Sequence, residues 1–450
     1  MLGDAMKKIL LSCFLTMSLL LSSISYINYI SINTFDAGQV KDTVKYLSSD
    51  EFKGRLSGSL ENAMVASFIK SEFQNSGLEP FMGNYYQSFE VNYPTSLSTD
   101  PMIAIVDSNG KTHKILEYGV NYKEDLLNFR NTEIEFNKSA ILNQNDESIY
   151  IKNSIGSVIF YTTSDNDLAF RSSFVENSKQ DLYIIVTKQT LEDIKTYLND
   201  GFSIYTYIPV SIKPTTINNV VGVLKGKDST LPPLVLGAHF DHLGMDLNNT
   251  IYSGALDNSS GTSFLLSLTK YIKRLGTPDR DIIFVAFNAE EFGLLGSQAF
   301  VDEYKDILKD SRVYNFDMIG SFDGIPLCIM GGDQDTANTP LISELTEVFQ
   351  SKKIYFNYLF EDASDHGPFR NAGIDAVTLC DNDTSRIHTP ADKVNYISEA
   401  AIDRCFSVMK PQLFKDGYSR NILYDNLEII FIFSCLSSLT FIFILRRSNS

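Results

Sequence analysis

The apolar positions of this chain follow three different patterns along its length. Long apolar stretches lie near both ends, at residues 9–30 and 429–445. Residues 85–210 carry short β-branched and aromatic runs between Asn, Asp, Ser and Gly, a pattern typical of strands joined by turns. From Asn219 onward, strand-like and helix-like apolar runs alternate, and this alternation predicts an α/β sheet.

The alternating part predicts three buried strands, at residues 234–238, 282–287 and 313–316. Helices are expected to begin near Ser260 and Gly293, and two amphipathic helices precede residue 77. We therefore predict a mixed, mostly parallel central sheet with helices on both faces. A β-rich inserted domain and a hydrophobic helix at each end complete the predicted fold.

Both apolar ends predict contact with a membrane. Met6-Lys-Lys8 precedes residues 9–30, as in a signal peptide or an uncleaved signal anchor, and no small-x-small cleavage site is evident, which favours an anchor. Residues 429–445 precede Arg446-Arg447, which predicts a transmembrane helix with its basic flank in the cytoplasm, although a buried helix is the alternative. The residues between the two helices would then lie on the extracellular side.

Composition excludes several classes of protein. The formal net charge of -17 disfavours binding to nucleic acid or to anionic lipid, since either needs a positive patch. Five cysteines without a CxxC pair predict neither a disulfide scaffold nor a cysteine zinc site. The five histidines are more informative, because four of them stand in motif-like contexts: His239, His242, His366 and His388.

Ionisable residues follow the predicted strands. His239, Asp241 and His242 come after the first strand, Glu290 and Glu291 after the second, Asp317 after the third, and Asp257 and His388 lie in separate loops. Taken alone, each has an ordinary explanation: a helix cap for Asp257, a solvated face for the glutamates, a surface or core position for His388. The carboxyl ends of parallel strands nevertheless form the usual ligand crevice of an α/β sheet, so we expect these groups to meet.

One hypothesis uses all of these residues, namely a catalytic site with two zinc ions. Imidazole nitrogens and carboxylate oxygens are the ligands of catalytic zinc, and a shared carboxylate makes a metal pair. His239, Asp257 and Asp317 could hold one ion, and Asp257, Glu291 and His388 the other. Glu290 would remain free as the general base for a metal-bridging water, and Asp241 would accept the second N–H of His239.

At this point the sequence resembles the M28 family of zinc metallopeptidases, which includes bacterial aminopeptidases. The resemblance is carried by Ala238-His-Phe-Asp-His242, Gly254-Ala-Leu-Asp-Asn-Ser-Ser-Gly261, Ala289-Glu-Glu-Phe-Gly-Leu-Leu-Gly-Ser297, Asn315-Phe-Asp-Met-Ile-Gly320 and Ile387-His-Thr-Pro390. Residues 47–58 and 364–369 are also similar to family segments.

The resemblance implies a zinc exopeptidase fold and the same ligand set, with Glu290 as general base. It further implies that Asp365 and His366 line the substrate pocket. We interpret His242 as a neighbouring pocket or structural residue. The β-rich region resembles, more loosely, the protease-associated domain that many members carry. Some members have a tyrosine before the last histidine, whereas this chain has Ile387, so oxyanion stabilisation would depend chiefly on metal.

The resulting domain assignment has six parts: a signal peptide or signal-anchor helix (1–33), the N-terminal part of the peptidase domain (38–90), the inserted domain (91–215), the peptidase domain with the metal site (216–416), a transmembrane helix (427–445) and a basic cytoplasmic tail (446–450).

The predicted function is an exopeptidase at the cell membrane, most simply an aminopeptidase acting on peptides or proteins. Two alternatives stay open: a catalytically silent, membrane-tethered receptor or adhesion module, and a related zinc amidase or cyclase. A serine hydrolase is disfavoured because no Gly-x-Ser-x-Gly elbow occurs, and HExxH is also absent. The sequence leaves the oligomeric state open.

Overall fold

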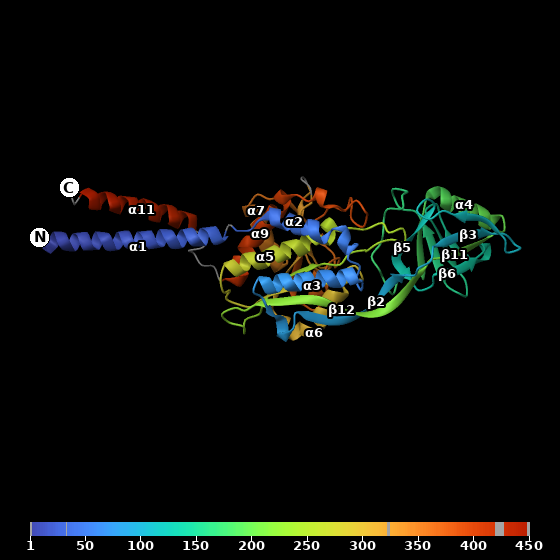
Figure 1. Cartoon of the computed structure of the whole chain (residues 1–450), viewed down its shortest axis with the longest axis horizontal. Helices are drawn as coiled ribbons and strands as arrows, with labels where there is room; N and C mark the ends of the chain where they lie inside the picture. Colours follow the sequence, from blue (N-terminus) through green and yellow to red (C-terminus); the bar gives the residue numbers. More distant parts are fainter. Residues whose placement is uncertain (1, 33, 322–324, 419–426, 448–450) are drawn as a thin grey trace.

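The computed structural model describes residues 2–32, 34–321, 325–418 and 427–447. Three bodies follow one another along the long axis of the molecule (Figure 1). A pair of terminal helices lies at one end, an α/β body lies in the middle, and a β-rich body lies at the far end. The described part of the chain therefore has the predicted fold class.

The α/β body contains a nine-stranded sheet in the order β1-β12-β14-β13-β15-β18-β16-β17, with β2 also paired to β12. Its centre, β14-β13-β15-β18, is parallel, and antiparallel pairings flank it. The strands are β1 (Glu79–Pro80), β2 (Tyr86–Ser96), β12 (Val210–Leu224), β13 (Leu234–His239), β14 (Ile282–Phe287), β15 (Arg312–Asp317), β16 (Leu327–Gly331), β17 (Phe356–Phe360) and β18 (Asp375–Asp381).

Both faces of this sheet are covered by helices, because the central strands are apolar on both sides. Leu234 and Leu236 belong to one core cluster, whereas Val235 belongs to the cluster on the opposite face. The first cluster includes residues of α2 (Ala37–Leu47), α3 (Leu60–Asn75), α5 (Gly261–Arg274), α7 (Pro340–Ser351) and α9 (Glu399–Gly417). The second includes residues of α6 (Leu295–Leu308) and α8 (His366–Asn371).

The β-rich body is inserted between β2 and β12, which pair antiparallel from Tyr86 to Ser96 and form a ribbon reaching it (Figure 1). One of its sheets has the order β5-β10-β9-β8-β7 and the other β4-β3-β11-β6. The elements are β3 (Met102–Val106), β4 (Thr112–Leu116), β5 (Tyr122–Phe129), β6 (Glu133–Phe136), β7 (Ile141–Gln144), β8 (Ser148–Lys152), β9 (Ser157–Tyr161), β10 (Leu182–Val186), α4 (Lys188–Asn199) and β11 (Ser203–Tyr207).

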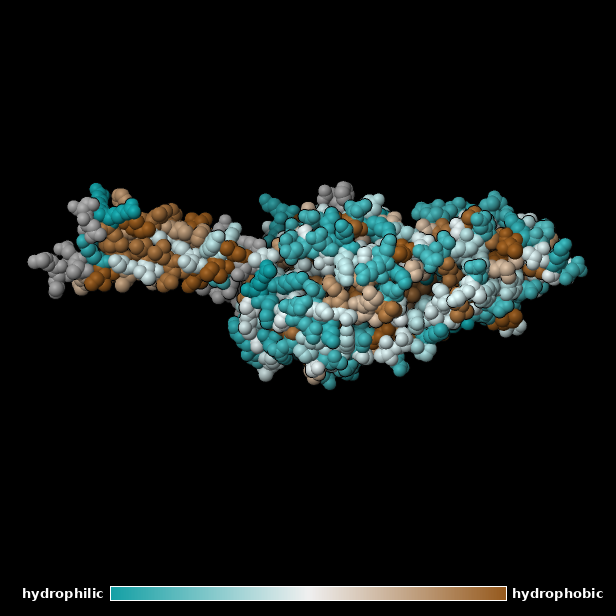
Figure 2. Space-filling view, viewed as in Figure 1, coloured by the Kyte–Doolittle hydropathy of each residue, from teal (hydrophilic) through white to brown (hydrophobic). Residues whose placement is uncertain are grey.

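The terminal helices α1 (Leu2–Ile32) and α11 (Leu427–Arg447) lie side by side (Figure 1). Their surface is largely apolar (Figure 2), and each is long and apolar enough to cross a membrane. The two helices contact each other through hydroxyl groups: Ser18 donates to the Ser434 carbonyl at 2.8 Å, and Ser438 donates to Ser18 at 3.0 Å. The rings of Phe14 and Phe441 stack beside this contact. The pair fits association with a membrane.

Observed boundaries follow the predicted ones closely where the apolar pattern is strong. The predicted strand 282–287 is β14, and the strand predicted at 313–316 lies within β15. Helix α6 begins at Leu295 rather than at Gly293, because residues 289–294 form the turn that carries the two adjacent glutamates. Short helical turns complete the described elements: η1 (Asp50–Phe52), η2 (Phe81–Gly83), η3 (Lys138–Ala140), η4 (Ala255–Ser260) and η5 (Val394–Tyr396).

Candidate metal centre

The candidate site lies at the carboxyl ends of three neighbouring strands. Strand β13 pairs in parallel with β14 and with β15, so the residues that follow these strands meet at one edge of the sheet. His239 ends β13, Asp317 ends β15, and the two adjacent glutamates follow β14. The turn η4 brings Asp257 to the same edge, and the loop after β18 brings His388.

The first group of donor atoms surrounds the Nε2 atom of His239. This atom lies 3.3 Å from Asp317 Oδ1, 3.5 Å from Asp257 Oδ1 and 4.0 Å from Glu290 Oε2. His239 is buried, and the donor atoms of His239, Asp257 and Asp317 all lie within 4.8 Å of one another. The predicted first set is thus assembled in space, with Glu290 beside it.

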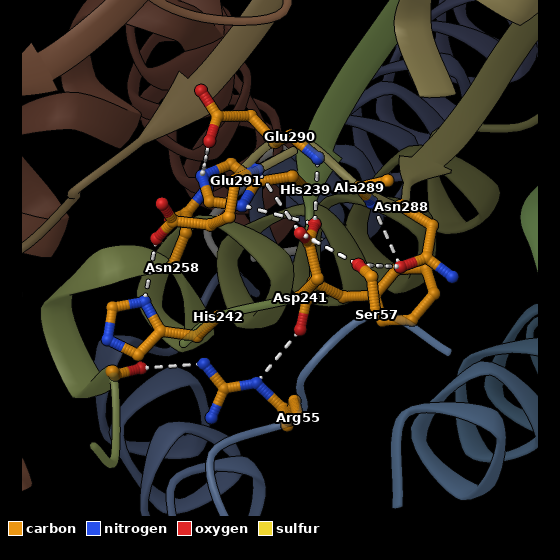
Figure 3. Close-up of polar contacts among 12 residues, drawn as sticks. Arg55, Ser57, His239, Asp241, His242, Asn258, Asn288, Ala289, Glu290 and Glu291 are labelled. Atoms are coloured by element: carbon orange, nitrogen blue, oxygen red, sulfur yellow. Dashed lines mark hydrogen bonds and ion pairs between the residues drawn. The ribbon is translucent and has the colours of Figure 1, made fainter. Parts of the chain in front are cut away.

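The second group surrounds the other oxygen of Asp257. His388 Nε2 lies 3.3 Å from Asp257 Oδ2 and 3.4 Å from Glu291 Oε1. His242 Nδ1 lies 3.0 Å from the same Glu291 oxygen and 3.6 Å from Asp257 Oδ2. The structure therefore adds His242, which we expected to be a neighbouring pocket or structural residue, as a further imidazole facing this group. Its ring points toward Glu291 in Figure 3.

Asp241 lies next to the donor groups and supports the turn after β14. Its carboxylate accepts hydrogen bonds from the backbone N–H groups of Glu290 and Glu291, at 3.1 and 3.2 Å, and from the Ser57 hydroxyl at 3.0 Å (Figure 3). The predicted contact with His239 Nδ1 spans 3.6 Å, which is longer than a hydrogen bond. This nitrogen has no hydrogen-bond partner among the described residues.

Arg55 is a structural residue that sequence reasoning did not assign. It is 1% exposed, and its guanidinium donates to the carbonyls of Leu47, Phe240, Ser253 and Gly254. Burial lowers the pKa of Arg55 to about 10, against nearby carboxylates that raise it. Arg55 therefore holds together the two loops that carry His242 and Asp257. The sequence offered one indication that Arg55 matters, since residue 55 lies in the segment 47–58 that is similar to a family segment.

Asn288 and Asp392 are two further residues without a predicted role. Asp392 accepts the backbone N–H groups of Leu256 and Asp257, at 2.8 and 3.0 Å, and so holds the turn that presents the shared carboxylate. Asn288 binds Asn62 and the Ser57 hydroxyl, which connects the end of β14 to α3. Both residues lie beside windows that the sequence singled out, but only the folded chain reveals their partners.

Asp365 and His366 have different surroundings, although they are adjacent. Asp365 is fully buried, and neither of its carboxylate oxygens has a hydrogen-bond partner in the described part of the chain. Burial raises the pKa of Asp365 to about 7. His366 instead lies 2.8 Å from the Thr378 hydroxyl through Nδ1 and 3.0 Å from the Glu361 carbonyl through Nε2. Both His366 nitrogens are therefore occupied within the fold.

Electrostatics at the site are dominated by buried carboxylates. Burial would lower the pKa of His239, but Glu290 and Asp317 outweigh it and raise this pKa well above its usual value. Burial would likewise lower the pKa of His388, but nearby carboxylates, chiefly Glu291, raise it well above its usual value. Burial raises the pKa of Glu290 well above the ordinary range of a carboxyl group. A protein that keeps such groups ionised near neutral pH needs positive charge among them.

Divalent cations fit this requirement and the chemistry of the donor atoms. Zinc takes imidazole nitrogen and carboxylate oxygen as ligands, and both described donor groups contain these atoms close together. The Asp257 carboxylate faces both groups, one oxygen toward each. The side chains present at the site therefore supply the kinds of donor atom that a divalent metal ion needs.

Comparisons with known proteins agree with this fold. Residues 219–411 match the model of Peptidase family M28. Aminopeptidase YwaD of Bacillus subtilis (strain 168) is 34% identical over 202 residues, which cover 42% of this chain and 42% of that protein, less than half of its length.

Solved structures share the fold. An aminopeptidase from Aneurinibacillus sp. strain AM-1 superposes with a TM-score of 0.60 at 18% identity, over 87% of this chain and 96% of that one. BSAP, a zinc aminopeptidase from Bacillus subtilis, gives a TM-score of 0.59 at 18% identity, over 86% and 96%. The family match of residues 219–411 and the fold shared with these aminopeptidase structures thus point to the same kind of protein, similar to peptidase family M28.

Proposed function

We propose that this chain is a membrane-anchored aminopeptidase that uses two zinc ions. The observation that carries the proposal is the position of Asp257. Its Oδ1 lies 3.5 Å from His239 Nε2, and its Oδ2 lies 3.3 Å from His388 Nε2, so one carboxylate faces two donor groups. The similarity to aminopeptidase YwaD and to the zinc aminopeptidase BSAP supports both zinc and aminopeptidase action.

In this proposal, His239, Asp257 and Asp317 hold one ion, and Asp257, Glu291 and His388 hold the other. His242 Nδ1, 3.0 Å from Glu291 Oε1, orients that carboxylate. The catalytic domain comprises residues 38–90 and 216–416, and residues 91–215 form the inserted domain. Zinc, when bound, lowers the pKa of a water molecule and polarises a carbonyl oxygen.

Glu290 is the proposed general base. Its side chain lies beside the first donor group and is 13% exposed, whereas the side chain of Glu291 is 2% exposed. The Glu290 carboxylate would take a proton from the attacking water and return it to the nitrogen of the leaving amine. Asp241 holds the backbone of both glutamates and so positions this base. Ile387 offers no polar group at the position where some family members have tyrosine.

The terminal helices are proposed to anchor the enzyme, with the catalytic domain on the extracellular side. Serine hydroxyls between α1 and α11 bind across the pair, which gives buried polar groups in an apolar layer their partners. This contact favours a retained N-terminal anchor over a cleaved signal peptide, since cleavage would expose the Ser434 and Ser438 face to lipid.

We expect the full chain in detergent to release single residues from substrate peptides that have a free N-terminus. N-acetylated copies of those peptides should be resistant. A chelator should abolish release and zinc should restore it, as measured by mass spectrometry of the products. Cleavage of the acetylated peptides would instead assign another exopeptidase or an amidase. A zinc-loaded chain without any turnover would favour the silent receptor module.

Replacement of the proposed base, Glu290→Gln, should lower kcat by about 10²- to 10⁴-fold, because proton transfer is lost while the amide keeps the side-chain shape. Zinc content and thermal stability of this variant should stay close to those of the wild type, which serves as the control for folding. Near-normal turnover with zinc bound would rule out the role of Glu290.

Stability of the metal-free chain should fall as pH rises above the unfolded histidine pKa of about 6.5. The raised pKa values of His239 and His388 give stability that is complete below the unfolded value of about 6.5 and is lost as pH rises through the folded values. Bound zinc should reduce this fall, because metal binding displaces the same protons. The check is a thermal melting series with and without chelator; a metal-free midpoint that rises with pH would contradict it.

Both terminal helices should remain in the membrane of the mature protein. A chain with different epitope tags at its two ends should keep both tags, stay in the membrane pellet after alkaline carbonate washing, and lose its catalytic domain when protease is added outside intact cells. Loss of the N-terminal tag during maturation would show a cleaved signal peptide and refute the retained pair.

A further inference from the structure

The inserted domain reaches the metal centre through one segment of the long connection between β9 and β10. We call residues 170–174 the contact segment. Ser173 donates its hydroxyl hydrogen to Glu291 Oε2, and the backbone N–H of Phe174 donates to the Glu291 carbonyl at 2.9 Å. The Arg171 N–H donates to the His388 carbonyl at 3.0 Å. The Phe170 ring faces the His388 ring at an interplanar angle of 28°, with centroids 6.1 Å apart.

Strand β5 of the inserted domain holds the contact segment in place through three consecutive residues. Lys123 donates to the Phe170 carbonyl at 2.8 Å, and Glu124 forms a buried ion pair with Arg171 at 2.9 Å. Asp125 accepts both the backbone N–H and the hydroxyl of Ser172, at 2.6 and 2.7 Å. The contact segment is thus a defined part of the inserted domain.

The catalytic domain holds the same segment from the other side. The Arg171 Nε donates to the Leu243 carbonyl at 3.2 Å, and the Tyr252 hydroxyl donates at 3.0 Å to the carbonyl of Ala169, the residue that precedes the segment. Phe174 packs against Phe292, with ring centroids 4.9 Å apart, in a core cluster shared by both domains. Polar and apolar contacts together place the segment against the ligand residues.

The two oxygens of Glu291 have different partners as a result. Oε2 accepts the Ser173 hydroxyl, whereas Oε1 lies 3.0 Å from His242 Nδ1 and 3.4 Å from His388 Nε2. A hydroxyl that occupies one oxygen stops the carboxylate from rotating and directs the other oxygen toward the second donor group.

On the basis of the function proposed above, we propose that Ser173 is a positioning residue supplied by the inserted domain, which sets the affinity of the second metal position by holding Glu291 in one orientation. The inserted domain would then be part of the metal centre rather than an attached module. Groups that orient metal ligands typically contribute about 10- to 100-fold to metal affinity.

The test is a zinc titration of the full chain in detergent after removal of metal, with a competing fluorescent chelator as the probe. Wild type should bind two ions. Ser173→Ala should bind one ion about 10- to 100-fold more weakly and leave the affinity for the other unchanged. Ser173→Thr keeps a hydroxyl and should restore affinity close to that of the wild type.

Ser178→Ala is the matched control, because it removes another hydroxyl of the same connection, outside the contact segment, whose partner is the Gln180 carbonyl rather than a proposed ligand. Its zinc affinities should match those of the wild type. Equal weakening in Ser178→Ala and Ser173→Ala would overturn the assignment to Ser173, since loss of any hydroxyl from this connection would then explain both. Unchanged binding in Ser173→Ala would overturn the inference alone, whereas a wild type that binds no zinc would overturn the proposed function itself.

Discussion

The burial of many carboxylates at one edge of the sheet is the constraint on which the structure around the site depends. The carboxylates of Asp241, Asp257, Glu291, Asp317 and Asp365 are all buried, and Glu290 lies among them. Such a concentration of negative charge is unfavourable unless hydrogen bonds, imidazoles and cations compensate it. Hydrogen bonds compensate part of it, because backbone N–H groups point at Asp241 and Asp392. The zinc ions of the proposed function would add positive charge among the rest.

The rest of the fold serves to hold these groups in place. Parallel pairing of β13, β14 and β15 aligns the ends of three strands, and helices on both faces keep that sheet buried. Arg55 then fixes the loops after β13 and before η4 through three carbonyl groups and ties them to the end of α2 through a fourth. Strand β5 fixes the contact segment in the same manner from the inserted domain. The site is therefore built from parts far apart in the chain, each with its own support.

The sequence was most informative where a local pattern is enough to identify an element, as with an apolar run followed by ionisable residues. The apolar runs located β14 and β15, and the residues after them were the ones that meet at the sheet edge. It was least informative where the role of a residue depends on a partner far away in the chain. Nothing local distinguishes Ser173 from the other serines of a polar loop, because its role requires the inserted domain to pack on Glu291. His242 was likewise ambiguous, since its ring direction depends on how the loop leaves β13.

The most direct test of the account is the number of metal ions held by the purified full chain and by its Asp257→Ala variant, counted by elemental mass spectrometry after gel filtration. A shared carboxylate predicts two zinc ions per wild-type chain and a loss of bound zinc in the variant, with the variant still folded by its thermal melting. Two tightly bound ions in Asp257→Ala would contradict the shared role of Asp257, and a wild type without bound metal would contradict the account as a whole.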